Sequence, residues 1–180
     1  MSKSLAFDAL DSPLGRIFIL CDEVALCALD FDGYEERLHA LARKRFEMYD
    51  LQPASDPLGM TSCLRAYFAG DVHAIDGLPV DGGGTPYQAR VWAALCTIPN
   101  GETRTYGQIA AQLGDTHARA VGHANSLNPI AIVVPCHRVI GADASLTGYA
   151  GGLEKKQWLL AHERTHARNV GPVQLSVFAD

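Results

Sequence analysis

The sequence predicts an α+β protein in which a small mixed N-terminal domain precedes a mainly helical C-terminal domain. Short runs of β-branched and aromatic residues mark the first part, and apolar residues at helical spacing dominate after residue 85. The stretch GLPVDGGGTPYQ at 77–88 separates the two, and its four glycines and two prolines break regular structure. The charge changes at the same place, because residues 1–85 hold 7 Lys+Arg and 14 Asp+Glu (−7), whereas residues 86–180 hold 8 and 6 (+2).

These features predict an N-terminal domain at 1–80, a linker at 81–88, a C-terminal domain at 86–170 and a tail at 171–180. The acidic first part disfavours a polyanionic partner, so only the second part suits nucleic acid. The same charge split is also compatible with a first part that merely has a solvated acidic surface.

The composition, 48% hydrophobic and 19% charged, is that of an ordinary globular protein. No apolar run is long enough to span a bilayer, and the N-terminus lacks the apolar core of a signal peptide, so we expect a cytoplasmic protein. Five scattered cysteines without a CxxC pair predict reduced thiols rather than a disulfide framework. Cys21 and Cys27 are assigned to the core rather than to a zinc site.

In the first part, residues 15–33 form two β-type runs separated by Asp22 and Glu23, which predicts a hairpin. A helix is expected at 35–46, where apolar residues share one face. A second helix is expected at 61–70, with Thr61 or Ser62 as its N-cap and Gly70 as its end. No catalytic constellation is recognisable in this part.

In the second part, a helix at 85–101 is expected to begin with Thr85 as the cap and Pro86 at the first helical position. Residues 105–126 then predict two short helices separated by Gly114 and Asp115, with Thr116 capping the second. Helix, glycine turn and helix form the pattern of a helix-turn-helix. On this pattern alone, a DNA-binding motif and a plain helical hairpin are equally good interpretations.

The second of these helices is built from small residues and offers one long cation, Arg119. A major-groove reader would present several Arg, Asn or Gln side chains to base edges. A thin surface with one protruding guanidinium instead suits close approach to the minor groove, with a side chain inserted between bases. The alternative is that the small residues pack on another helix and Arg119 is simply solvated.

The segment NPIAIVVPCHRVIG at 128–141 places a thiol and an imidazole after an apolar run. We expect a buried strand or a core run at 130–134, ended by Pro135, which would hold Cys136 rigidly. A thiol needs a base to become a nucleophile, and His137 is available if the chain turns sharply or a water bridges the two. Glu163, at the end of a helix at 153–163, is the candidate to orient the imidazole. The alternative for Cys136 is an inert buried thiol.

At these residues the chain resembles the O6-alkylguanine-DNA alkyltransferases, most closely the bacterial constitutive form. The matching stretches are TPYQARVWAALCTIPNGETRTYGQIA, ARAVGHANSLNPIAIVVPCHRVIG and LTGYAGGLEKKQWLLAHE. They lie within residues 85–163, and the combination of PCHRV with a GYAGG loop is highly specific. The resemblance implies an RNase H-like roll for the N-terminal α/β domain, which matches loosely. It implies a winged helix-turn-helix-like fold for the C-terminal domain.

The resemblance also implies catalytic roles. Cys136 would be the alkyl acceptor, His137 the base that acts through a water, and Glu163 the carboxylate that holds His137. Asn128 would join the recognition helix to the active-site turn. Tyr106 would support base flipping and protonate the departing guanine.

For DNA binding, the resemblance implies Arg119 as the finger that fills the duplex, together with Tyr106, Thr105, Ala120 and Gly122. For substrate binding it implies Tyr149, Ala150, Val139 and Pro135. We expect neither a cofactor nor a metal. We expect the protein to be a monomer.

Three positions depart from the family pattern. Ala150 follows Tyr149 where some members carry serine, which predicts an altered pocket size. The turn Asn125–Leu127 (residues 125–127) lacks the basic or glycine residues seen elsewhere, which predicts weaker contact with phosphates. Ala144 stands where a turn glycine is common.

The function implied is DNA repair by direct reversal, in which methyl or small alkyl groups pass irreversibly from O6 of guanine to Cys136. O4 of thymine is a second candidate substrate. The partner would be double-stranded DNA whose damaged nucleotide is flipped out, because the reacting atom otherwise lies inside the stack. Competing hypotheses are a non-enzymatic damage-recognition protein, a helix-turn-helix regulator that responds to methylation, and a Cys–His hydrolase.

Overall fold

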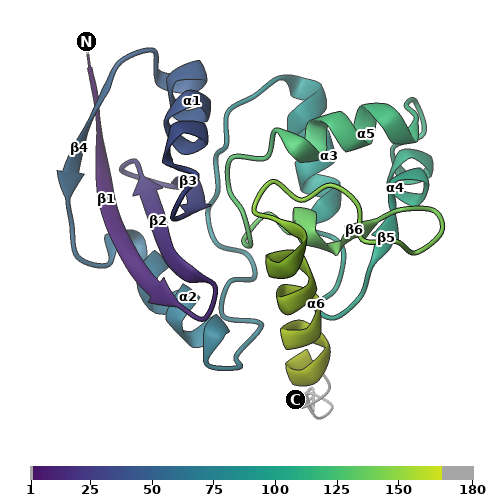
Figure 1. Cartoon of the computed structure of the whole chain (residues 1–180). Coiled ribbons are helices and arrows are strands. Elements are labelled where there is room, and N and C mark those ends of the chain that lie inside the picture. The colour runs from purple at the N-terminus through teal and green to yellow at the C-terminus, as the bar shows by residue number, and fades with distance from the viewer. Residues whose placement is uncertain (1, 168–180) are drawn as a thin grey trace, which may run out of the picture.

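The computed structural model describes residues 2–167, and within them the chain forms two lobes that pack side by side (Figure 1). The N-terminal lobe holds a four-stranded sheet with two helices, and the C-terminal lobe is mainly helical. The α+β architecture is therefore as predicted. The expected tail at 171–180 lies outside the described residues, as do residues 168–170 of the expected C-terminal domain.

The sheet of the first lobe has the strand order β3-β2-β1-β4. Strand β1 is antiparallel to β2 and parallel to β4, and β2 is antiparallel to β3. The predicted hairpin at 15–33 is confirmed, and Asp22 Oδ1 accepts the backbone N–H groups of Val24 and Ala25 in its turn, both at 2.9 Å. Strands β1 and β4 were not predicted. The strands are β1 (Lys3–Ser12), β2 (Gly15–Cys21), β3 (Leu26–Phe31) and β4 (Tyr49–Pro53).

Two helices cover opposite faces of this sheet. Helix α1 (Glu35–Phe46) has the predicted bounds and packs its Leu38 and Ala42 on one face. Helix α2 (Met60–Phe68) follows the short helix η1 (Pro57–Gly59) and packs on the other face. The predicted cap of α2 is wrong, because Gly59 occupies the N-cap position with φ 74°, and Thr61 instead donates to Asp8 Oδ2 at 2.5 Å.

Strand β3 lies at the edge of the sheet, yet all six of its residues are buried. Its outer edge is covered by backbone from the rest of the chain, because Leu26 N donates to Pro79 O at 2.9 Å and Leu29 N donates to Pro129 O at 2.9 Å. An uncovered edge would expose unpaired N–H and C=O groups. The pairing therefore joins the linker and the second lobe to the sheet.

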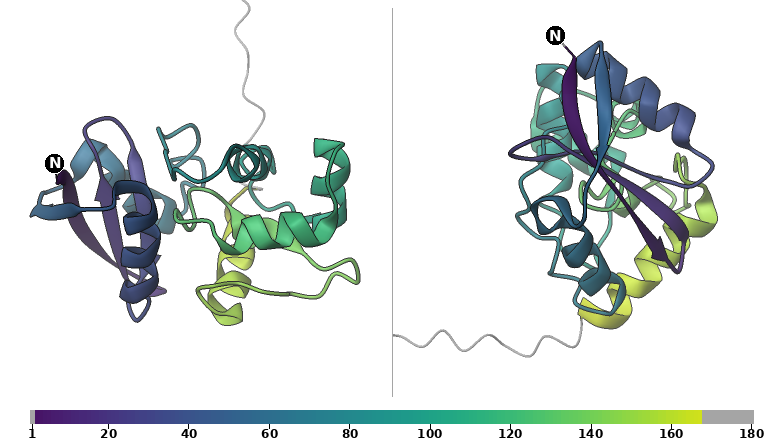
Figure 2. Two further views of the ribbon diagram at one scale, coloured as in Figure 1. Left: turned by 90° about the horizontal axis from the view of Figure 1, so that it is seen from above. Right: turned by 90° about the vertical axis from the view of Figure 1, so that its left-hand side faces the viewer.

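The second lobe is built around a helix triplet and a long final helix (Figure 2). A capping box with Gln88 confirms Thr85 as the N-cap of α3, and Thr105 forms the same arrangement with Gln108 at α4. Thr116 does not cap α5, because His117 occupies that position and accepts from Ala120 N at 3.3 Å. The elements are α3 (Pro86–Leu95), β5 (Arg104–Thr105), α4 (Tyr106–Leu113), α5 (Ala118–Ser126), η2 (Cys136–Arg138), β6 (Val139–Ile140) and α6 (Leu153–Ala167).

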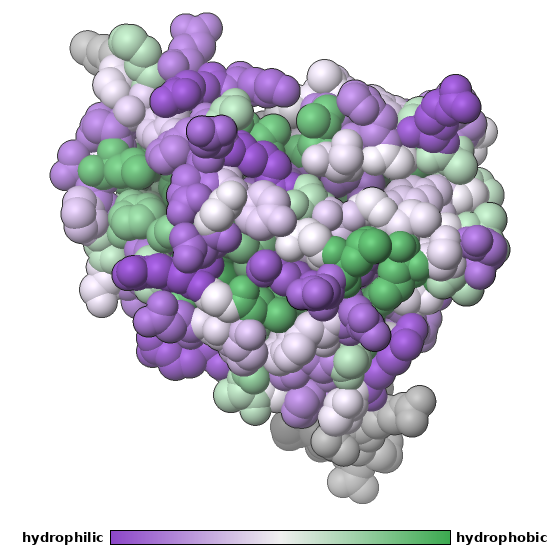
Figure 3. Space-filling model, in the orientation of Figure 1, coloured by the Kyte–Doolittle hydropathy of each residue, from purple (hydrophilic) through white to green (hydrophobic). Residues whose placement is uncertain are grey.

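The face of the molecule seen in Figure 3 is mainly hydrophilic, with small separate apolar patches. Across residues 2–167, no helix is long and apolar enough to cross a membrane. In the same part of the chain, no group of three or more His, Cys, Asp or Glu side chains is placed to hold a metal ion. Cys21 and Cys27 are buried free thiols in the sheet, as assigned from the sequence.

Candidate active site

The segment that leads to Cys136 is an irregular loop, so of the two alternatives for 130–134 the strand is wrong, whereas the core run fits because four of these five residues are buried. Its backbone folds around the side chain of Asn128, whose Nδ2 donates to Val134 O at 2.9 Å and to Ile130 O at 3.3 Å. Asn128 Oδ1 accepts from Ile130 N at 3.0 Å. Ile132 has φ 69°, which is incompatible with a strand. The buried side-chain amide of Asn128 thus takes the place of the backbone partners that a neighbouring strand would supply, and it stabilises a sharp turn of the chain.

Cys136 begins the one-turn helix η2 directly after this loop, and its side chain is buried. Burial raises the pKa of the Cys136 thiol, although a hydrogen bond with Asn128 and the cations Lys156 and Arg37 partly counteract it. The resting thiol is therefore protonated, and a base is needed to make it a nucleophile.

His137 is fully buried, and its Nε2 lies 2.7 Å from Glu163 Oε1. Burial lowers the pKa of His137, so the imidazole is neutral near pH 7. Burial opposes ionisation of Glu163, but His137 and Arg138 outweigh it and hold the pKa of that carboxyl well below its usual range. A carboxylate only accepts, so Nε2 carries the proton and Nδ1 keeps a free lone pair. Nδ1 has no hydrogen-bond partner among the described residues.

Glu163 lies in the interior of α6, one turn before its end, so its predicted position at the helix end is wrong. The sequence ERTHA continues the helix after Glu163, and a buried carboxylate there needs partners. Arg138 donates to both carboxylate oxygens at 2.9 Å, and the Tyr67 hydroxyl donates to Oε1 at 2.9 Å. Arg138 also donates to Ile98 O at 2.6 Å and to Asn100 Oδ1. The charge of Glu163 is thereby fully paired.

Lys156 is a second buried charge on α6 that sequence reasoning missed. Its ammonium donates to Val139 O at 2.5 Å and Thr147 O at 2.8 Å, which ties the following loop to β6. Burial lowers the pKa of Lys156 to about 8. Leu153, the first residue of this helix, is 49% exposed.

Three of the four predicted substrate-binding residues, Pro135, Val139 and Tyr149, lie near Cys136. Pro135 and Val139 are buried on either side of η2. Tyr149 contributes a buried hydroxyl that has no hydrogen-bond partner among the described residues. The pKa of Tyr149 is raised well above its usual range, mainly by burial and secondarily by the nearby Cys136. Ala150 follows it in an exposed position. These side chains form a small, mostly apolar surround for the thiol.

The predicted DNA-binding residues lie on α4 and α5. Thr105 caps α4, and Tyr106 begins it, with a pKa that burial raises. A Cβ added at Gly122 would lie 3.7 Å from the Tyr106 ring, so α5 passes close to this tyrosine. Ala120 is half-buried and Arg119 is exposed on α5. Parallel pairing of Arg104 with Val139 places the start of α4 beside the end of η2.

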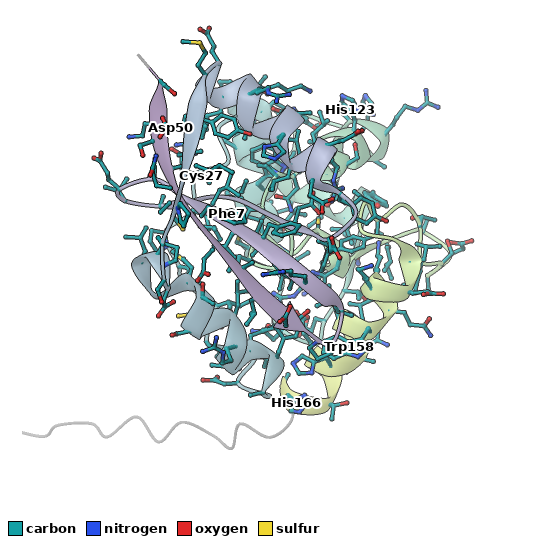
Figure 4. The ribbon with its side chains drawn as sticks, turned by 60° about the vertical axis from the view of Figure 1, so that its left-hand side comes forward. Phe7, Cys27, Asp50, His123, Trp158 and His166 are labelled. Atoms are coloured by element: carbon teal, nitrogen blue, oxygen red, sulfur yellow. The ribbon has the colours of Figure 1, made fainter. Side chains whose placement is uncertain are left out.

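The residues that sequence reasoning missed are mainly buried polar groups. Arg138 and Tyr67 both contact Glu163, and neither position carries a sequence signal, since Arg and Tyr are common on surfaces and in ordinary cores. The run Cys136–Arg138 offered the only clue, because a cation inside an apolar segment requires an acceptor. Figure 4 shows further polar and aromatic groups, with Trp158 and His166 on α6 and His123 on α5.

Comparison with protein families gives two adjoining matches. A model described as the ribonuclease-like domain of 6-O-methylguanine DNA methyltransferase matches residues 5–82. A model described as the DNA-binding domain of the same enzyme matches residues 86–165. Together they account for most of the chain.

Individual relatives agree with these matches. A methylated-DNA–protein-cysteine methyltransferase from Shigella flexneri is 49% identical over 160 residues, which are 87% of this chain and 94% of the relative. One from Methanosarcina barkeri is 44% identical over 168 residues, 90% and 99% of the two chains. Among solved structures, Mycobacterium tuberculosis OGT in complex with DNA superposes with a TM-score of 0.76 at 42% identity, covering 89% of this chain and 94% of that one.

Proposed function

The chain belongs to the 6-O-methylguanine DNA methyltransferase family, and on that premise we propose that it repairs DNA by direct reversal. In this proposal, a methyl or small alkyl group passes from O6 of guanine to Cys136 in one irreversible step. O4 of thymine is a second substrate to test. The reaction takes place in the cytoplasm on double-stranded DNA, and it needs no cofactor.

One observation carries the proposal. The buried carboxylate of Glu163 fixes the Nε2–H tautomer of His137, which leaves the Nδ1 lone pair free next to a buried thiol in the same turn. In the proposed first step, Nδ1 accepts the thiol proton through a bridging water. Glu163 then stabilises the imidazolium that forms, in the way a third group orients the base of a nucleophilic pair.

The thiolate attacks the O6-alkyl carbon, a C–S bond forms, and the C–O bond breaks with its electron pair remaining on guanine. Tyr106 supplies a proton to the departing base; burial raises the pKa of its hydroxyl, which therefore carries that proton at neutral pH. The product is a thioether on Cys136, which has no thiol left to regenerate. Each molecule therefore reacts once.

DNA binding is proposed from the solved relative that holds DNA and from the exposed helix α5. Gly122 and Ala120 give α5 a thin surface that can approach the minor groove. Arg119 then enters the stack in place of the flipped nucleotide, and Thr105 and Tyr106 contact its flank. Asn128 transmits the position of α5 to the active-site turn, and Pro135, Val139, Tyr149 and Ala150 surround the flipped base.

The test is the intact mass of the protein after incubation with duplex DNA that carries O6-methylguanine. We expect a gain of one methyl group per molecule, located on Cys136 by peptide mapping, and no further gain with time. Cys136→Ser should gain nothing under the same conditions. A methyl group on another cysteine, or repeated turnover without a mass gain, would contradict the proposal.

The competing function is damage recognition without transfer. It predicts tight binding to the same duplex with no mass gain in the wild-type protein. The buried base and thiol pair favours transfer, since recognition alone would not require either group.

A further inference from the structure

The edge strand β3 of the N-terminal lobe contacts the active-site loop through its backbone. Leu29 N donates to Pro129 O at 2.9 Å, and Ala131 N donates to Leu29 O at 3.1 Å. These two hydrogen bonds lie on either side of Ile130, within the loop that Asn128 folds. The end of β3 is therefore fixed relative to the segment that leads to Cys136.

Phe31, two residues further along β3, packs against the loop that contains Tyr149 and Gly151. Its ring is fully buried and meets the Tyr149 ring edge-on, with centroids 6.4 Å apart. A Cβ added at Gly151 would lie 2.8 Å from Phe31 Cε2 and 2.8 Å from Tyr149 Cε1. The backbone of Gly151 thus rests directly on both rings, and Phe31 determines how far that backbone can retreat.

The position of Phe31 is itself held from two directions. The neighbouring Asp30 accepts two hydrogen bonds from the Arg37 guanidinium of α1, at 2.8 and 2.6 Å. The Lys155 ammonium of α6 lies 5.4 Å from the centre of the Phe31 ring. A planar bidentate ion pair is a geometrically specific contact. The aromatic ring is consequently a firm support for the loop rather than a mobile one.

We propose that Phe31 is a positioning residue for alkyl transfer, by which the N-terminal lobe holds the Tyr149–Gly151 backbone (residues 149–151) close to Cys136. The inference rests on the proposed function and extends it to substrate choice. A loop held close accepts a methyl group and resists larger alkyl groups. Selectivity for small groups is then determined partly by a residue outside the DNA-binding lobe.

The experiment compares Phe31→Leu with the wild-type protein in single-turnover transfer from one duplex that carries either O6-methylguanine or O6-butylguanine. Leucine lacks the ring atoms that support Gly151, so the loop can retreat. We expect the methyl rate constant to fall about fivefold to tenfold and the butyl-to-methyl ratio to rise about threefold or more, as misplacement of a pocket by a fraction of an ångström predicts.

Phe18→Leu is the matched control. Phe18 lies on the adjacent strand β2 and stacks on Phe7, with centroids 6.0 Å apart, in the cluster covered by α1. This variant removes an aromatic ring from the same sheet without touching the loop. It should lower thermal stability but leave the butyl-to-methyl ratio at the wild-type value. An unchanged ratio in Phe31→Leu, or an equal change in both variants, would overturn the inference.

A double-mutant cycle with Gly151→Ala tests the contact itself. The added methyl group collides with Phe31, so Gly151→Ala alone should slow methyl transfer strongly. Combined with Phe31→Leu it should slow transfer less, because Cε2 is gone, whereas independent multiplicative effects would overturn the inference. If the wild-type protein transfers no methyl group at all, the proposed function fails and this inference fails with it. If the wild-type protein transfers the methyl group but Phe31→Leu leaves the butyl-to-methyl ratio unchanged, only this inference is contradicted and the proposed function stands.

Discussion

Helix α6 carries charged groups inside the protein, whereas helix α5 carries its one long cation outside. On α6, Glu163 and Lys156 have no exposed surface, and every hydrogen-bonding atom of Glu163 has a partner. On α5, Arg119 is exposed and most of the other residues of the helix are small. The two helices thus represent two ways to use charge in one lobe.

The difference follows from what each charge must do. A buried charge is held by a fixed set of partners in a medium of low dielectric, so its geometry and protonation state are fixed in advance. An exposed cation costs little to keep and stays free to contact a polyanion. We therefore expect substitutions on α6 to change stability and chemistry together, and substitutions on α5 to change DNA-dependent steps alone.

The largest expected effect is that of Glu163→Gln. It leaves the buried Arg138 guanidinium without its counter-charge and removes the group that fixes the His137 tautomer. Removing one partner of a buried ion pair costs roughly 3–5 kcal/mol, and we expect a loss of that size in the free energy of unfolding. Urea denaturation measures it, with Glu154→Gln, an exposed carboxylate in the first turn of α6, as the control.

The same variant should transfer alkyl groups far more slowly even where it remains folded, because the imidazole is no longer oriented. A Glu163→Gln protein as stable as Glu154→Gln would show that the buried network is not what distinguishes α6 from α5.

The next effect is that of Arg119→Ala, which should separate the two helices most cleanly. We expect the free energy of unfolding to change by less than about 0.5 kcal/mol, as for other exposed sites. Transfer from duplex DNA should fall about tenfold or more, since the flipped state loses the side chain that replaces the base. Transfer from the free base O6-methylguanine should stay at the wild-type rate.

Arg164→Ala, on the exposed side of α6, provides the control for loss of a surface cation in general. Equal losses in the two arginine variants would mean that Arg119 acts only through net charge.

Sequence reasoning found the exposed features of this comparison better than the buried ones. The cap Thr85, the turn residue Gly114 and the thin helix with Arg119 are local signals, because a cap or a turn depends on a few neighbouring residues. Capping by His117 rather than Thr116 shows that even these signals are uncertain by one position.

The buried features depend on residues that are distant in the sequence, and they were predicted less accurately. The apolar run at 130–134 has the composition of a strand, but the Asn128 side chain takes the place of ladder partners. Lys156 looks like a surface residue of α6 until its two carbonyl partners are known. Glu163 was identified as the candidate partner of His137, but its place inside the helix was missed.

A smaller effect, in pH dependence, tests whether Lys156 is a charged buried group. Its pKa is lowered to about 8 in the folded protein from an ordinary value near 10.5, so the unfolded state binds more protons between these values. The contribution of Lys156 to the free energy of unfolding therefore rises as the pH increases from about 8 to about 10.5. Relative to Lys156→Met, the wild-type protein should gain on the order of 1–2 kcal/mol between pH 8 and pH 9.5.

The measurement is urea denaturation of both proteins at the two pH values. The difference between them removes the opposing contribution of the buried Cys21 thiol, whose raised pKa lowers stability as pH increases. A difference that stays constant with pH would show that Lys156 is not desolvated in the way Glu163 is.

The smallest effect is expected at Ala144, in the exposed turn between β6 and the Tyr149 loop. Ala144 has φ 63°, a left-handed conformation that glycine adopts without steric cost. Ala144→Gly should therefore increase the free energy of unfolding by about 0.5–1 kcal/mol, after the greater freedom of glycine in the unfolded chain is subtracted. Because the side chain contacts neither the α6 network nor α5, the rate of transfer from duplex DNA should not change. Thermal denaturation and single-turnover transfer test the two expectations together, and a faster or slower transfer rate would show that this turn belongs with the loop that Phe31 supports.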